Sequence, residues 1–145
     1  MEMQDYLAGW LDGTTEPPAV TRLIGIRLLE AGEGRARLTL TTGPQHYNPM
    51  QIVHGGILCD LADAAMGVAL ASALESGESF TTVQLGIQYF RSLREGSLVA
   101  AGHIVRRGSN VGYVECEIED EAGRLVAKAS STCFITRSGP VSPGS

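Results

Sequence analysis

The order of apolar and polar residues predicts one long apolar helix between two groups of β-strands. From about Gly56 to Ala73, apolar residues recur at helical spacing with little polar material on any face, so this helix should be buried. Shorter runs on either side alternate between apolar and polar residues, which is typical of strands. These runs cover residues 21–32, 34–42, 80–90, 97–106, 111–118 and 125–136.

Both ends of the chain differ from this pattern. Large apolar side chains recur at helical spacing in the first twelve residues, at Met3, Tyr6, Leu7 and Trp10. They predict a short amphipathic helix, ended before the Pro17-Pro18 pair, that either packs on the domain or covers a binding site. We expect an N-terminal helix and loop at residues 1–18, one domain at 19–137 and a disordered tail at 138–145.

Two strands, one buried helix and four further strands define an α+β fold in which an antiparallel sheet wraps around a long central helix. The first two strands form a hairpin that turns within residues 30–34, and residues 43–53 form a loop that leads to the helix. An open sheet leaves edge strands with unpaired backbone groups. We therefore expect self-association, as a homodimer or as a homotetramer built from two dimers.

Composition excludes several classes of protein. The chain has 145 residues, of which 43% are hydrophobic, and a formal net charge of −5, which disfavours nucleic acid as a partner. The longest uncharged apolar run is too short to span a membrane, and the N-terminus lacks the pattern of a secretory signal. Three widely spaced cysteines favour neither disulfides nor a zinc site, so we expect a cytoplasmic protein without a metal.

The basic residues are unevenly distributed. Seven of the eleven Lys and Arg residues lie between Arg91 and Arg137, whereas residues 38–90 contain none. This distribution fits either solvated strand edges or a local site for a phosphorylated ligand.

Two aspartates on the apolar helix are the strongest chemical signal. Asp60 and Asp63 are the only formally charged residues between Val53 and Leu74. They lie about 60° apart on a helical wheel, opposite the main apolar stripe. A buried carboxylate must be paired, hydrogen-bonded or protonated to be tolerated. We interpret Asp60 as solvent-facing or stabilised by the helix dipole, and Asp63, nearer the middle, as functional.

The sequence His54-Gly55-Gly56 immediately precedes the predicted helix. The first N–H groups of a helix have no intrahelical acceptor, and glycine lets a ligand approach them closely. Such groups can stabilise an oxyanion. Small residues further along the helix, such as Ala64 and Gly67, either leave room for an acyl group or permit close packing against the sheet.

The pattern H-G-G-x-x-x-x-L-x-D-x-A-x-G at residues 54–67 closely resembles hotdog-fold thioesterases of the 4-hydroxybenzoyl-CoA and phenylacetate-degradation type. The resemblance covers most of the chain, including "YFRSLREG" and "RRGSNVGYVECEIEDEAGRLVAKAS". It implies hydrolysis of an aryl- or medium-chain acyl-CoA to the free acid and CoA. No separate cofactor is implied, because CoA is part of the substrate.

The resemblance also implies roles for individual residues. Asp63 attacks the thioester carbonyl or activates a water, and the Gly55 N–H polarises that carbonyl. The side-chain amide of Asn48 helps to orient the thioester carbonyl group. The hydroxyl of Thr82, or of Thr81 if the register differs by one, assists the water or the carboxylate. His54 mainly holds the loop, with direct contact to the substrate as the alternative. In similar enzymes the two halves of the site come from different subunits, so a monomer should be inactive.

The same resemblance points to contacts with the coenzyme. Gly56 allows close approach of the substrate, and the phosphates would meet Arg91, Ser109, Asn110 and Arg137. Arginine suits phosphate because its planar guanidinium offers several donors at once.

Two other functions stay open at this point. A hotdog-fold hydratase or dehydratase also acts on acyl thioesters, although the histidine followed by Phe-Pro-Gly that we expect of a dehydratase is absent. A non-catalytic acyl-CoA binding module would hold the ligand without releasing thiol. A serine hydrolase is disfavoured because the chain has no G-x-S-x-G motif, and the three histidines are not spaced as metal ligands.

Overall fold

A computed structural model describes residues 2–138 of the chain. Its helices and strands follow in the order α1 (Met3–Asp12), α2 (Ala19–Ile24), β1 (Arg27–Gly32), β2 (Arg35–Thr42), the short 3-10 helix η1 (Pro44–His46), α3 (Gly55–Ala71), β3 (Glu78–Tyr89), β4 (Gly96–Arg107), β5 (Val111–Glu119) and β6 (Leu125–Arg137). The predicted long helix and the last four strands are confirmed to within two residues at each end.

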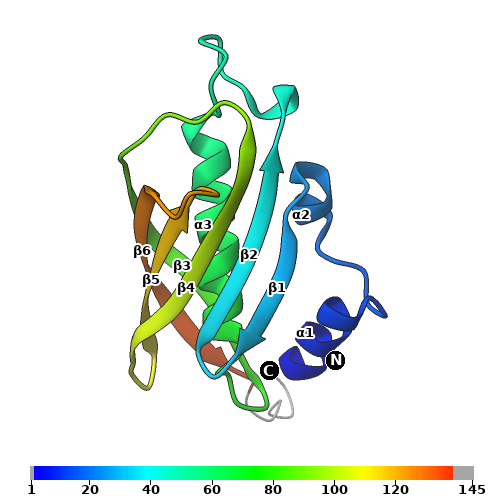
Figure 1. Ribbon diagram of the computed structural model, residues 1–145. Helices are drawn as coiled ribbons and strands as arrows, with labels where there is room; N and C mark the ends of the chain where they lie inside the picture. The colour runs from blue at the N-terminus through cyan, green and yellow to red at the C-terminus, as the bar shows by residue number, and fades with distance from the viewer. Residues whose placement is uncertain (1, 139–145) are drawn as a thin grey trace.

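The six strands form one antiparallel sheet in the order β1-β2-β4-β5-β6-β3, and the sheet curves around α3 (Figure 1). The predicted α+β fold with a sheet wrapped around a central helix is therefore confirmed. The hairpin turn between β1 and β2 falls at Glu33 and Gly34, both of which have positive φ angles. Two such residues in succession suit the right-handed twist of a tight hairpin.

The prediction of a strand from Thr21 onward is wrong. Residues 19–24 form α2, and β1 begins only at Arg27. Pro18 precedes the helix, and Gly25, with φ of 98°, ends it by donating its N–H to the Thr21 carbonyl. These local start and stop signals outweigh the alternating pattern of the segment.

The core lies between α3 and the concave face of the sheet. Leu61, Ala65 and Met66 of α3 are fully buried. A Cβ on Gly102 of β4 would lie only 2.5 Å from the Ala65 carbonyl oxygen, so small residues on both elements allow the helix to approach the sheet closely. Leu7 of α1 is buried in the same core, which ties the N-terminal helix to the rest of the fold.

The two edge strands of the sheet have different surroundings. The helix α1 packs beside β1, whereas no described strand pairs with the outer edge of β3. The side chain of Val83 on β3 is 63% exposed. An unpaired strand edge is a template for another strand.

Within residues 2–138, no helix is both long enough and apolar enough to cross a membrane. The predicted disordered tail begins at Ser138, the last described residue, and otherwise lies outside the described residues.

Candidate active site

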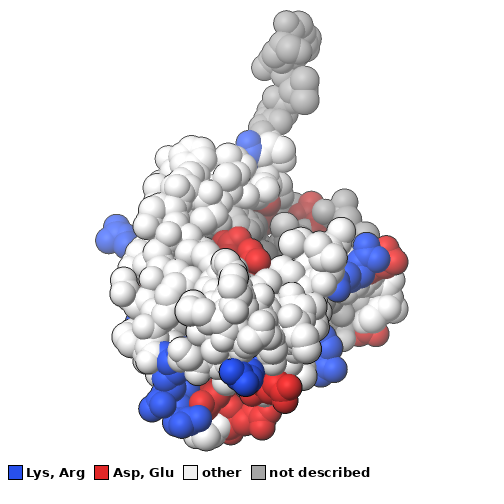
Figure 2. Space-filling view, turned by 90° about the horizontal axis from the view of Figure 1, so that it is seen from above, with Lys and Arg blue, Asp and Glu red and all other residues white. Residues whose placement is uncertain are grey.

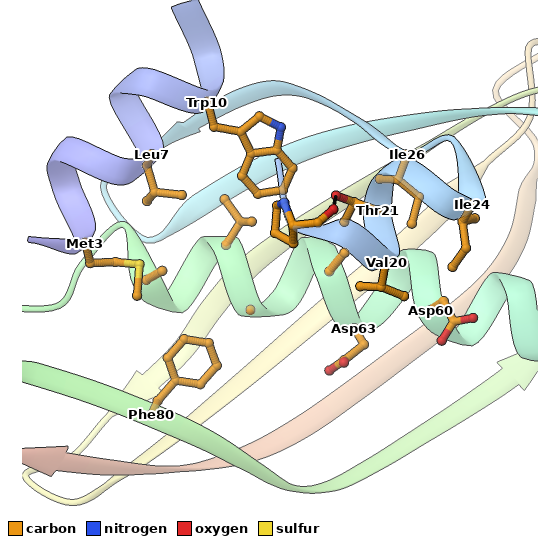
Figure 3. A pocket seen from close by; sticks show the side chains of 15 residues that line it. Met3, Leu7, Trp10, Val20, Thr21, Ile24, Ile26, Asp60, Asp63 and Phe80 are labelled. Atoms are coloured by element: carbon orange, nitrogen blue, oxygen red, sulfur yellow. Dashed lines mark hydrogen bonds between the residues drawn. The ribbon is translucent and has the colours of Figure 1, made fainter. Parts of the chain in front are cut away.

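An apolar pocket of about 370 Å³ lies beside α3, on the side that faces α1 and α2 (Figure 3). Its walls come from α1, the segment around α2, one side of α3 and Phe80 of β3. Asp60 and Asp63 are the only charged residues among its described lining. Figure 3 shows both carboxylates towards one end of the pocket, below Val20 and Ile24.

Asp63 has an unusual electrostatic environment. Although the Asp63 side chain stays partly open to solvent in the single chain, partial desolvation by its apolar neighbours raises the pKa of its carboxyl above the ordinary value, and the nearby charge of Asp60 raises that pKa further. The Thr82 hydroxyl acts in the opposite direction and lowers the pKa of Asp63. Asp60 and Asp63 thus face the same space, as their spacing on the helix predicts.

Thr82 reaches Asp63 from β3, the strand that follows the helix. Its hydroxyl also lies 3.7 Å from the sulfur of Cys133, its cross-strand neighbour on β6. Thr81 is exposed, because successive residues of a strand point to opposite faces. The register with Thr82 beside the carboxylate is therefore the one that the structure adopts.

His54 caps the start of α3. Its ring atom Nδ1 accepts a hydrogen bond of 2.8 Å from the Gly56 N–H. The expectation that both glycine N–H groups are unpaired is therefore wrong for Gly56. Among the described residues the Gly55 N–H meets no acceptor, as expected for the first residue of a helix.

Two further contacts hold this end of the helix. The Tyr89 hydroxyl donates to the Gly55 carbonyl oxygen at 2.7 Å. The His54 N–H donates to the carbonyl oxygen of His46 at 2.8 Å. The buried ring of His46 in turn bonds the Ile24 carbonyl oxygen through Nε2 at 2.8 Å and accepts the Gly43 N–H at Nδ1. A network of hydrogen bonds therefore connects α2 to the start of α3.

Asn48 forms a local turn in the loop before the helix. Its side-chain oxygen accepts the Met50 N–H at 2.9 Å and the Ile52 N–H at 3.3 Å. Among the described residues neither N–H group of the side-chain amide meets an acceptor, so both can donate to a ligand.

The residues that we expect to act together do not meet within one chain. Gly55 and Asp63 are eight residues apart on a continuous helix, which separates them by about 12 Å along its axis. One carbonyl group cannot contact both at hydrogen-bonding distance.

The expected coenzyme contacts are also separated. Arg137 donates to the Ser109 carbonyl oxygen at 2.6 Å and to Asn110 Oδ1 at 3.2 Å, so these three residues form one cluster. The same guanidinium pairs at 3.0 Å with Glu78, at the start of β3. Arg91 follows the opposite end of β3, which is roughly 36 Å long.

Charge is interspersed on the face of the molecule shown in Figure 2. Lys and Arg side chains lie near its rim, several of them beside acidic ones, and they do not form one broad basic patch. Acidic side chains near the centre of the view are surrounded by surface that carries neither charge.

Several residues at the site escaped prediction from the sequence. The Tyr89 hydroxyl, the links made by His46 and the pocket wall formed by α2 all depend on contacts between distant segments. Burial of a histidine with both ring nitrogens bonded leaves no local signature in the sequence. Only the Pro18 and Gly25 signals could have revealed α2.

Comparison with known proteins identifies the family to which the chain belongs. Residues 50–127 match the model of the Thioesterase superfamily. Acyl-coenzyme A thioesterase PaaI of Escherichia coli K12 is 30% identical over 113 residues, which cover 77% of this chain and 79% of that protein.

Solved structures agree with the sequence matches. The Escherichia coli PaaI protein from the phenylacetic acid degradation operon superimposes with a TM-score of 0.80 at 25% identity, covering 96% of this chain and 98% of that one. A phenylacetic acid degradation-related protein from Ralstonia eutropha JMP134 gives a TM-score of 0.81 at 29% identity, covering 89% and 98%.

A curved antiparallel sheet wrapped around a long helix is the hotdog fold, which this chain shares with the Escherichia coli PaaI structure. The chain belongs to the Thioesterase superfamily and is a thioester hydrolase.

Proposed function

We propose that the protein is an acyl-CoA thioesterase that hydrolyses an aryl- or medium-chain acyl-CoA to the free acid and CoA. One observation carries the proposal: Asp63 lies at an apolar pocket, where partial desolvation raises the pKa of its carboxyl. A carboxylate with reduced hydration is a better base and nucleophile than one in open water.

Two routes are open to the Asp63 carboxylate. As a nucleophile it bonds to the carbonyl carbon, the carbon–sulfur bond breaks, CoA leaves as the thiolate, and water then cleaves the mixed anhydride. As a base it takes a proton from water while the water oxygen bonds to the carbonyl carbon, after which CoA leaves. In both routes the Thr82 hydroxyl, which is hydrogen-bonded to Asp63, orients the carboxylate or the water.

The negative charge that develops on the carbonyl oxygen needs a donor. The Gly55 N–H suits this role because it meets no acceptor among the described residues and lies at the positive end of the α3 dipole. The Asn48 amide, in the neighbouring loop, adds a second donor to orient the acyl group, and the His54 ring holds the helix start in place.

The 12 Å between Gly55 and Asp63 requires a second copy of the chain. The free edge of β3 supplies a way to recruit it, through antiparallel pairing of two β3 strands about a two-fold axis. Val83 forms a bulge in β3, so an axis that sets the two copies of Gly86 opposite each other places Tyr89 opposite Thr82 of the partner subunit. Because Tyr89 holds Gly55, each helix start then approaches the other subunit's Asp63.

The same pairing unites the proposed coenzyme contacts. It sets Arg91 opposite the start of the partner's β3, where the Ser109, Asn110 and Arg137 cluster lies. Two separate groups of polar residues in one chain thus become one surface for the nucleotide in a dimer. Gly56 lies next to Gly55 and has no side chain, so the part of CoA between the thioester and the nucleotide can pass close to the backbone there.

Release of thiol from acyl-CoA substrates, followed against pH, tests the proposal. Asp63 must be ionised to act, and its pKa is raised, so kcat/KM should fall on the acid side through a pKa above the ordinary aspartate value of 3.8. A panel of phenylacetyl-, 4-hydroxybenzoyl-, hexanoyl- and decanoyl-CoA covers both acyl classes. Absence of thiol release from all of them would favour a binding module or a hydratase instead.

A further inference from the structure

The pocket beside Asp63 continues along α3 as an apolar channel. From Asp63 to Ala71 the helix advances by about 12 Å, and both residues line the same cavity. Small residues of α3 leave this space open at Ala64, Gly67 and Ala71. Beyond Asp63 no residue of the described lining carries a charge, so the channel suits a hydrocarbon chain rather than a polar group.

Side chains of α1 form the far end of this channel. Figure 3 shows Met3 and Leu7 at the end opposite the two aspartates, with Trp10 above the middle. The helix is fixed there by Gln4, whose side-chain amide donates to the carbonyl oxygens of Ala71 and Ser72 at 3.0 Å. These carbonyls lie at the C-terminal end of α3, where the last turn of a helix lacks intrahelical donors. Gln4 therefore holds α1 against the end of the channel.

We propose that the preferred substrate is a straight-chain acyl-CoA of medium length and that Met3 and Leu7 set the upper limit of that length. The inference rests on the proposed thioesterase function. The thioester lies at Asp63, and the saturated chain extends along α3 beneath α1. A compact aryl group would fill only the part of the channel nearest Asp63 and leave the apolar end without contacts.

Shortening Leu7 tests the far end of the channel. Leu7→Ala removes part of the wall and should raise kcat/KM for dodecanoyl-CoA relative to octanoyl-CoA by about tenfold, the lower end of the effect of one methylene in an apolar pocket. Leu11→Ala is the matched control, because Leu11 lies on the same helix, is 41% exposed and is not part of the lining. An unchanged ratio in a folded Leu7→Ala variant would overturn the inference.

Gly67→Ala tests the middle of the channel and does not depend on the stability of α1. Its new methyl group would lie 3.4 Å from the Phe80 ring, an ordinary contact that narrows the space between α3 and β3. Alanine stabilises the interior of a helix relative to glycine, so we expect the Gly67→Ala variant to fold. We expect kcat/KM for octanoyl-CoA to fall by roughly tenfold relative to acetyl-CoA.

The outcomes separate the two proposals. If the wild type releases thiol but prefers phenylacetyl-CoA to every straight chain, or if Gly67→Ala leaves the chain-length profile unchanged, the channel does not hold the acyl group and the thioesterase proposal stands. If the wild type releases no thiol from any substrate, both proposals fail.

Discussion

Replacing Asp63 by asparagine should lower kcat for thiol release by at least about 100-fold, the lower bound expected for loss of a catalytic acid–base group. Asparagine keeps the shape of the side chain but can neither bond to the carbonyl carbon as a carboxylate nor accept a proton from water. KM should change less than kcat, because the apolar lining of the pocket is untouched.

The stability of this variant distinguishes lost chemistry from lost structure. A carboxyl group whose folded pKa is raised favours its neutral form in the folded state, so its charge weakens folding above that pKa. The neutral amide of the Asp63→Asn variant removes this penalty, and thermal unfolding at neutral pH should show a melting temperature equal to or above that of the wild type.

Asp60→Asn is the matched control for Asp63→Asn. It removes a carboxylate from the same pocket, but one that is not expected to contact the thioester. Loss of the Asp60 charge should lower the pKa of Asp63 and move the acid limb of the pH profile to lower pH. Equal losses of kcat in the two variants would contradict a special role for Asp63.

Replacing Gly55 by proline should cost roughly 100-fold or more in kcat, as expected for removal of one oxyanion donor. Proline deletes the N–H and nothing else that the helix needs, because this N–H has no acceptor among the described residues and proline is favoured at the first position of a helix. The extended backbone of His54, with ψ of 135°, also suits a residue that precedes proline.

Gly55→Ala is the control for this substitution. Any Cβ at position 55 would come within 3.0 Å of the Tyr89 ring, so alanine and proline disturb Tyr89 alike. Only alanine keeps the N–H. If the two variants lose the same activity, displacement of Tyr89 is responsible and the N–H has no role in stabilising the oxyanion.

The sequence was sufficient to predict the sheet and the central helix because both depend on patterns repeated over many residues. The run from Leu58 to Ala69 is long enough, and its apolar residues recur regularly enough, to indicate a buried helix, and the last four strands alternate clearly. The segment 19–24 carries too few residues for such a pattern. Leu23 in this segment is 84% exposed, so the strand predicted there does not bury the apolar side chains that its pattern implied.

The candidate site was predictable only where a residue conflicts with its surroundings. Asp63 is conspicuous as a charge on an apolar helix, and the glycines mark the helix start. The contact of Tyr89 with Gly55 joins residues 34 positions apart, and no local sequence pattern predicts it. The 12 Å that separate Gly55 from Asp63 become apparent once the helix is known to be continuous.

Mixing two inactive variants tests most directly whether the active site is shared between two chains. Asp63→Asn and Gly55→Pro chains, carrying different affinity tags, are co-expressed, and the mixed dimers are isolated through both tags. Each mixed dimer contains one site with both substitutions and one with neither, so it should recover about half of the wild-type kcat per dimer. If the mixed dimers are no more active than either variant alone, Asp63 and Gly55 do not act together across two subunits.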